Sequence, residues 1–143
     1  EGGRISITLS KQLKEMLILT KRAESVASAQ PAAIMKKFVG QMSELVEAVP
    51  ALPEERLAQE TALLITKSDV REELDRLGSH LDAASALLSQ GGVIGRRLDC
   101  LCQELNRETN TICAKAQDIE LSKIGLELKA MIEQFREQVQ NIE

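Results

Sequence analysis

Aromatic side chains are almost absent from this sequence. It has two phenylalanines and no tyrosine or tryptophan in 143 residues. A surface that stacks single-stranded nucleic acid on a row of aromatic rings is therefore excluded, and contact with nucleic acid would have to use phosphates and hydrogen bonds. The core must be filled by Leu, Ile, Val, Ala and Met, which suits the packing of helices.

Long apolar runs and excess positive charge are also lacking. The longest apolar runs are too short to span a bilayer, and the start, EGGRIS, does not form a signal peptide, so we expect no membrane partner. The net charge of −4 argues against a dedicated nucleic-acid binder. The charge is uneven, however: residues 95–115 carry four basic and three acidic groups, while 117–143 carry three and six. A local basic stripe remains compatible with this distribution.

Apolar residues recur at spacings of three and four along most of the chain, which is the helical period. Prolines and glycines divide the pattern into about six helices with short connections, which favour antiparallel neighbours. The predicted helices cover residues 4–30, 32–49, 54–66, 69–90, 95–115 and 119–143. The first carries a heptad seam, which predicts a partner helix: Leu9, Leu13, Met16, Thr20, Ala23 and Ala27. We therefore expect an all-α fold of antiparallel hairpins or a bundle, with long coiled-coil-like helices.

Residues with known effects on helix ends set these boundaries. Pro31 is expected to end the first helix, and the prolines within 50–53 to separate the second from the third. Asp69 followed by Glu72 has the spacing of a capping box. Two glycines after Gln90 supply a left-handed stop, and Asp118 is a good N-cap for the last helix.

The stretch 95–115, GRRLDCLCQELNRETNTICAK, carries more polar chemistry than a surface helix needs. Two polar rows flank its apolar stripe at helical spacing. The first row contains Arg96, Asp99, Gln103, Arg107 and Asn110. The second contains Arg97, Glu104, Thr111 and Lys115, with Glu108 at its edge. A third row lies on the preceding helix: Asp69, Glu73, Arg76 and His80.

Packing these two helices as an antiparallel hairpin would bring their polar rows together. The expected cluster contains Glu73, Arg76 and His80 near Arg96, Asp99, Gln103, Glu104, Asn106, Arg107 and Glu108. Carboxylates with an amide or imidazole are ligands suited to Mg²⁺ or Mn²⁺, and such an ion activates water and stabilises charge on a phosphate. Two simpler interpretations stay open: an ion-pair network between helices or subunits, and a half-buried His80 whose hydrogen bonds are satisfied.

Three cysteines lie on one helix, at positions 100, 102 and 113. Cys100 and Cys102 are two residues apart, so they point in different directions and do not form a CxxC site. We expect all three to be small buried or half-buried residues in a reducing compartment.

The segment GRRLDCLCQELNRETNT closely resembles the signature of the YicC family of bacterial proteins. Two further stretches agree with that family, at residues 69–80 and in the ending REQVQNIE at 136–143. The resemblance is strong over about the last 75 residues and holds in outline over the first 68. It implies that 1–143 is the C-terminal helical domain of a longer protein, with a helical arm at 1–68, the signature at 69–143, and an N-terminal domain outside this chain.

The family is regarded as metal-dependent endoribonucleases, or factors in bacterial RNA decay, that assemble as oligomers. The resemblance thus implies a cytoplasmic, Mn²⁺- or Mg²⁺-dependent enzyme with RNA, further copies of itself and other RNA-decay factors as partners. The implied catalytic residues are Glu73, His80, Asp99, Glu104 and Glu108, all but His80 also being metal candidates. The implied RNA-binding residues are Arg76, Arg96, Arg97, Gln103, Asn106, Arg107, Asn110 and Lys115. The alternative is a non-catalytic helical oligomerisation or adaptor module that binds RNA or an RNA-decay enzyme without cutting. A third interpretation is that this chain only oligomerises and that catalysis lies in the N-terminal half.

Overall fold

The computed structural model describes residues 2–48 and 54–142 of the chain. Within these residues it contains five helices and no strand, so the all-α class is confirmed. The helices are α1 (Gly2–Ala48), α2 (Glu54–Lys67), α3 (Arg71–Gln90), α4 (Gly95–Lys115) and α5 (Ile119–Gln140). In the part of the chain described, no helix combines the length and apolar character that crossing a membrane requires.

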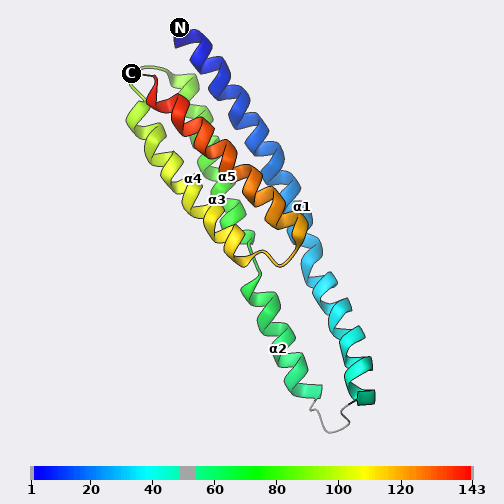
Figure 1. The fold of residues 1–143 in the computed structure, drawn as a ribbon. Coiled ribbons are helices and arrows are strands. Elements are labelled where there is room, and N and C mark those ends of the chain that lie inside the picture. The colour runs from blue at the N-terminus through cyan, green and yellow to red at the C-terminus, as the bar shows by residue number, and fades with distance from the viewer. Residues whose placement is uncertain (1, 49–53, 143) are drawn as a thin grey trace.

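The N-terminal half of α1 forms a four-helix bundle with α3, α4 and α5 (Figure 1). Each of these helices packs against two others, in the cyclic order α1, α3, α4, α5. The C-terminal half of α1 continues beyond the bundle and pairs with α2, forming an arm. Since α2 contributes no fully buried residue, the arm is a two-helix layer with no core of its own.

The bundle core is built from the apolar seams of its four helices. All six residues of the predicted heptad seam of α1 are buried, and α3 contributes Leu74, Leu77, Leu81 and Ala84. Phe135 of α5 is completely buried and is the largest side chain in the core. Burying a Leu or Phe side chain contributes about 1.5–3 kcal/mol, so these seams dominate the stability of the bundle.

The predicted break at Pro31 is wrong, because α1 runs through it without interruption. An internal proline removes one backbone hydrogen bond and costs about 3 kcal/mol. Packing on both sides offsets this cost: Ala27 and Gln30 are buried before the proline, and Ile34 and Phe38 are half-buried beside α2 after it. Two predicted helices are therefore one. The break predicted within residues 50–53 lies outside the described residues.

The predicted helix ends are confirmed in part. Asp118 caps α5 by accepting the backbone N–H of Leu121 at 3.2 Å, and Gly91 and Gly92 have φ of 73° and 81°. The capping box with Glu72 does not form, because α3 begins at Arg71 with Val70 in the N-cap position.

Asp69, one residue before that N-cap, binds Arg71 instead. Its Oδ1 accepts the Arg71 backbone N–H at 3.0 Å, and its Oδ2 lies 2.7 Å from the guanidinium. The side-chain hydrogen bond with Arg71, followed by the backbone one, lowers the pKa of Asp69 from 3.8 to about 2.

The three cysteines are free thiols in different environments. Cys102 is buried and Cys113 half-buried, as expected, but Cys100 is exposed, which corrects the prediction for that residue. Burial raises the pKa of the Cys102 thiol to about 12. Cys100 differs because it lies on the solvent-facing side of α4 in the part of the chain that the structure describes.

Candidate metal and RNA site

The polar rows of α3 and α4 meet along the line where these two antiparallel helices pack. A short connection containing Gly91 and Gly92 joins the helices, so α3 residues near its end lie opposite α4 residues near its start (Figure 1). Arg76 lies opposite Glu108, with Nε 2.9 Å from Oε1. The hairpin therefore brings together residues that are 32 positions apart in the sequence.

His80, Glu104 and Glu108 form the one compact group of potential metal ligands in the described part of the chain. One ligand atom from each lies within 4.8 Å of the other two. Glu108 is buried, while His80 and Glu104 are half-buried, so the group is reachable from solvent. Imidazole nitrogen and carboxylate oxygen together suit a divalent ion such as Mn²⁺, whereas Mg²⁺ usually prefers oxygen alone. These donors fit the kind of metal that the sequence resemblance implied.

Ion pairs surround this group. Besides its bond to Glu108, Arg76 lies 3.6 Å from Glu72 and 3.8 Å from Glu73. The hydrogen bond with Glu108 is the largest cause of the raised pKa of Arg76. Lys115 lies 2.8 Å from Oε1 of Glu73. The interhelical ion-pair network that the sequence left open is thus present between α3 and α4.

One buried side-chain oxygen on α3 and one on α4 accept no hydrogen bond from any described residue. One is Oε2 of Glu73, whose other oxygen is held by Lys115. The second is Oδ1 of Asn106, a half-buried residue of α4 that lies two helical turns after Asp99, on the same side of the helix. An unpaired buried acceptor costs about 1–3 kcal/mol, so both atoms are ready acceptors for a donor or a cation.

Asp99 lies apart from the α3 carboxylates, contrary to the expected cluster. Its Oδ1 accepts a hydrogen bond from Nε of Arg136 on α5 at 3.1 Å, and Gln103 approaches its Oδ2 at 3.5 Å. The reason is geometric: α4 packs against both α3 and α5, and Asp99 lies on the side of α4 next to α5. Periodicity within single helices does not pair Arg136 with Asp99, although Arg136 begins the REQVQNIE ending that agrees with the family.

The remaining basic and amide candidates on α4 are open to solvent. The exposed members are Arg96, Arg97, Gln103, Arg107 and Asn110. Arg107 lies 3.9 Å from Glu104, a loose contact for an ion pair, and three quarters of its side chain is exposed. These guanidinium groups remain available to an external anion, whereas Arg76 and Lys115 already bind carboxylates.

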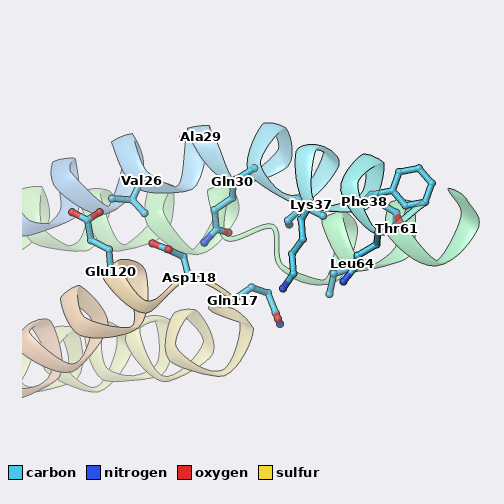
Figure 2. Close-up of a pocket in the computed structure, with 13 residues that line it drawn as sticks. Val26, Ala29, Gln30, Lys37, Phe38, Thr61, Leu64, Gln117, Asp118 and Glu120 are labelled. Carbon is cyan, nitrogen blue, oxygen red and sulfur yellow. The ribbon is translucent and has the colours of Figure 1, made fainter. Parts of the chain in front are cut away.

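A separate hollow of about 490 Å³ lies where the arm joins the bundle. Figure 2 shows Gln30 and Lys37 extending from α1 toward the α4–α5 connection, where Gln117 and Asp118 lie. Gln30 is buried, and its Nε2 has no hydrogen-bond partner among the described residues. The residues that line this hollow include none of the sequence-predicted site residues and no imidazole. The chemistry therefore favours the α3–α4 seam as the functional site.

Comparison with known proteins places these features in a family. The sequence profile described as "Endoribonuclease YicC-like, C-terminal" matches residues 19–143. The "Probable endoribonuclease YicC" of Haemophilus influenzae is 36% identical over 143 residues, covering 100% of this chain and 49% of that protein. The protein of the same description from Clostridioides difficile is 34% identical, with the same coverage. The chain thus spans about half the length of these curated relatives.

Proposed function

The chain belongs to the YicC-like endoribonuclease family through its C-terminal domain, and we propose that it carries the metal-dependent RNA-cleaving site of such an enzyme. The observation that supports this proposal is the convergence of His80, Glu104 and Glu108 from two helices. Each of the three was singled out by the sequence. A half-buried imidazole beside two carboxylates offers three donor atoms that one divalent ion could share.

We propose that His80, Glu104 and Glu108 hold the ion and that Mn²⁺ fits this donor set better than Mg²⁺. When bound, the ion supplies an activated water and stabilises negative charge on the phosphate under attack. Glu73 stands one helical turn from Arg76, with its buried Oε2 free to accept a hydrogen bond. Its role is to orient neighbouring groups, because Lys115 already neutralises its charge.

RNA binding is assigned to the exposed basic residues of α4. Arg107 reaches solvent next to Glu104, and Arg96 and Arg97 lie at the start of the same helix. One guanidinium group can donate two parallel hydrogen bonds to the oxygens of a phosphate. These three arginines would therefore hold the RNA backbone beside the metal ligands. The chain has a net charge of −4, so these exposed guanidinium groups would form a local basic stripe in an acidic chain.

We further propose that the chain works as a homo-oligomer, in the cytoplasm, alongside other factors of RNA decay. The arm supports the oligomer, because it carries large apolar side chains that are between 40% and 61% exposed: Met35, Val39, Leu63 and Leu64. Helix layers of this kind bury such residues against another layer. Light scattering of the wild-type chain and of Val39→Glu would test this, since a monomeric wild-type chain contradicts it.

Cleavage of a structured RNA, measured against Mn²⁺ concentration, tests the catalytic proposal. Glu104→Gln, Glu108→Gln and His80→Ala should each reduce the cleavage rate at least about tenfold. Replacing a residue that only supports a metal ligand already costs about tenfold, so loss of a ligand itself should cost no less. Glu127→Gln, which removes an exposed carboxylate on α5, is the matched control and should cut at the wild-type rate. Because relatives are about twice as long, the same variants should be made in a full-length protein.

A different result would identify the adaptor function instead. RNA binding that persists in all three site variants, without metal-dependent cleavage by the wild-type protein, would assign the seam to structure. Charge reversal at Arg96 and Arg107 should then abolish RNA binding, and neither the wild type nor these variants should cleave RNA. That outcome would remove the catalytic proposal.

A further inference from the structure

Glu108 belongs to two arrangements at once. It is one of the three clustered metal-ligand candidates, and it is also the main partner of Arg76. Only 7% of its side chain is exposed, whereas 49% of the Arg76 side chain is. The buried carboxylate is therefore fixed, and the guanidinium is the member of the pair that can move.

A divalent ion bound to Glu108 would meet the positive charge of Arg76 at close range. Like charges separated by a few ångströms repel, more strongly where protein has replaced water. The ion would also need the negative charge of the Glu108 carboxylate, which the Arg76 guanidinium now neutralises. In the arrangement observed, Arg76 thus competes with a cation for Glu108.

The contacts of Arg76 allow it to leave. Its one short bond is Nε to Glu108 at 2.9 Å, and its other carboxylate neighbours, Glu72 and Glu73, are at 3.6 and 3.8 Å. Glu72 is 87% exposed, so its pair with Arg76 is weak. Lys115 differs, because it bonds Glu73 at 2.8 Å and also approaches the Asp69 carbonyl at 3.4 Å. Lys115 therefore keeps Glu73 neutralised whether Arg76 stays or moves.

We propose that Arg76 couples RNA to the metal: without RNA it holds Glu108 and weakens metal binding, and an RNA phosphate draws it away. This inference rests on the proposed function, since it requires the His80, Glu104 and Glu108 metal site. An RNA phosphate next to the ion offers Arg76 a second anion, so the guanidinium changes from a competitor of the ion into a ligand of the substrate. By thermodynamic reciprocity, bound metal then increases the affinity for RNA by the same factor by which RNA increases the affinity for metal.

The test is Mn²⁺ affinity, measured by calorimetry with and without a short mixed-sequence RNA made non-cleavable by phosphorothioate and 2′-O-methyl groups. In the wild-type chain the RNA should increase Mn²⁺ affinity about fivefold, the ratio that corresponds to one partly exposed charge pair. Without RNA, Arg76→Met should already bind Mn²⁺ as tightly as the wild-type chain does with RNA. Adding RNA should not increase its Mn²⁺ affinity further. Arg71→Met removes the same charge from an exposed position on α3 that binds only Asp69, and should behave as wild type.

Circular dichroism confirms the fold of each variant, and Arg76→Lys serves if Arg76→Met does not fold. Lysine keeps the charge and loses the guanidinium contact, so its RNA effect should lie between those of the wild type and Arg76→Met. Lower or unchanged Mn²⁺ affinity in the Arg76 variants would overturn the coupling, because Arg76 would then orient Glu108 as a ligand or play no part. Failure of the proposed function looks different: Mn²⁺ binding would be absent from the wild type, or unchanged by Glu104→Gln and Glu108→Gln.

Discussion

Lys115, the last residue of α4, places its Nζ 2.8 Å from Oε1 of Glu73, in the first turn of α3. The two residues are 42 positions apart in the sequence. Only 6% of the Glu73 side chain is exposed, against 36% for Lys115. The pair closes the α3–α4 hairpin at the end opposite its glycine connection, and it neutralises a carboxylate that the bundle has taken out of water.

Removing one partner of this pair should destabilise the protein. Lys115→Met leaves the buried Glu73 charge unpaired, which we expect to cost about 2 kcal/mol, below the value for fully buried pairs because Lys115 is partly solvated. Urea unfolding measures the change. The double variant Lys115→Met, Glu73→Gln should recover most of the loss, and Lys123→Met on the exposed face of α5 should change little. Equal losses for Lys115→Met and Lys123→Met would contradict the role of the pair.

The pair of Asp69 with Arg71 predicts a dependence of stability on acid. The folded pKa of Asp69 is lowered from 3.8 to about 2, so its contribution is complete above about pH 4 and disappears as the pH falls toward 2. Because the pair is exposed, that contribution should be below about 1 kcal/mol. Asp69→Asn should therefore be less stable than wild type at neutral pH and converge with it in acid. A difference that grows as the pH falls has the wrong sign and would refute this.

The contact between Asp99 and Arg136 predicts that Asp99 does not bind the metal. Asp99→Asn keeps the size of the side chain and weakens the pair across α4 and α5. We expect a loss of stability below about 1 kcal/mol, because both partners are about one-third exposed, and no change in Mn²⁺ affinity. Calorimetry measures the Mn²⁺ affinity of Asp99→Asn and of Glu108→Gln, and only Glu108→Gln should lose it. Loss of Mn²⁺ binding in both variants would return Asp99 to the site.

Two glycines in helices should respond in opposite ways to alanine. A Cβ added at Gly125 would lie 2.7 Å from Sγ of Cys113, whereas one at Gly78 meets nothing within 4 Å. Gly125→Ala should cost about 1–3 kcal/mol through overpacking, and Gly78→Ala should stabilise by about 0.5–1 kcal/mol. Thermal unfolding tests both. Adding Cys113→Ala to Gly125→Ala should restore much of the loss, and if it does not, the clash is not the cause.

The cysteines should differ in reactivity according to burial. Cys100 is exposed, burial raises the pKa of Cys113, and burial raises that of Cys102 to about 12. Iodoacetamide at mildly alkaline pH should label Cys100 first and Cys102 last, because the thiolate is the reactive form. Peptide mass spectrometry follows each site. In urea the three rates should converge, and rapid labelling of Cys102 in the folded protein would contradict its placement in the core.

Much of the fold followed from periodicity. The buried seam of α1, the bounds of α4 and the cap at Asp118 were all predicted from residue spacing, because amphipathic helices and N-caps are local features. The predicted helix end at Pro31 is wrong because it too rests on a local feature. A local rule gives the cost of a proline, but packing from two sides of α1 decides whether the helix continues.

For the candidate site, too, some features depend on the sequence alone and others on the tertiary structure. The sequence alone determined the all-α class, the helices that carry the polar rows, and the residue types that make metal and phosphate chemistry conceivable, because these depend on spacing within one helix. Only the tertiary structure decided the partners: His80 with Glu104 and Glu108, Arg76 with Glu108, and Asp99 with Arg136. A helix that packs against two others presents its polar rows to different neighbours, and that choice depends on the rotation of each helix in the bundle, which spacing along one chain does not contain.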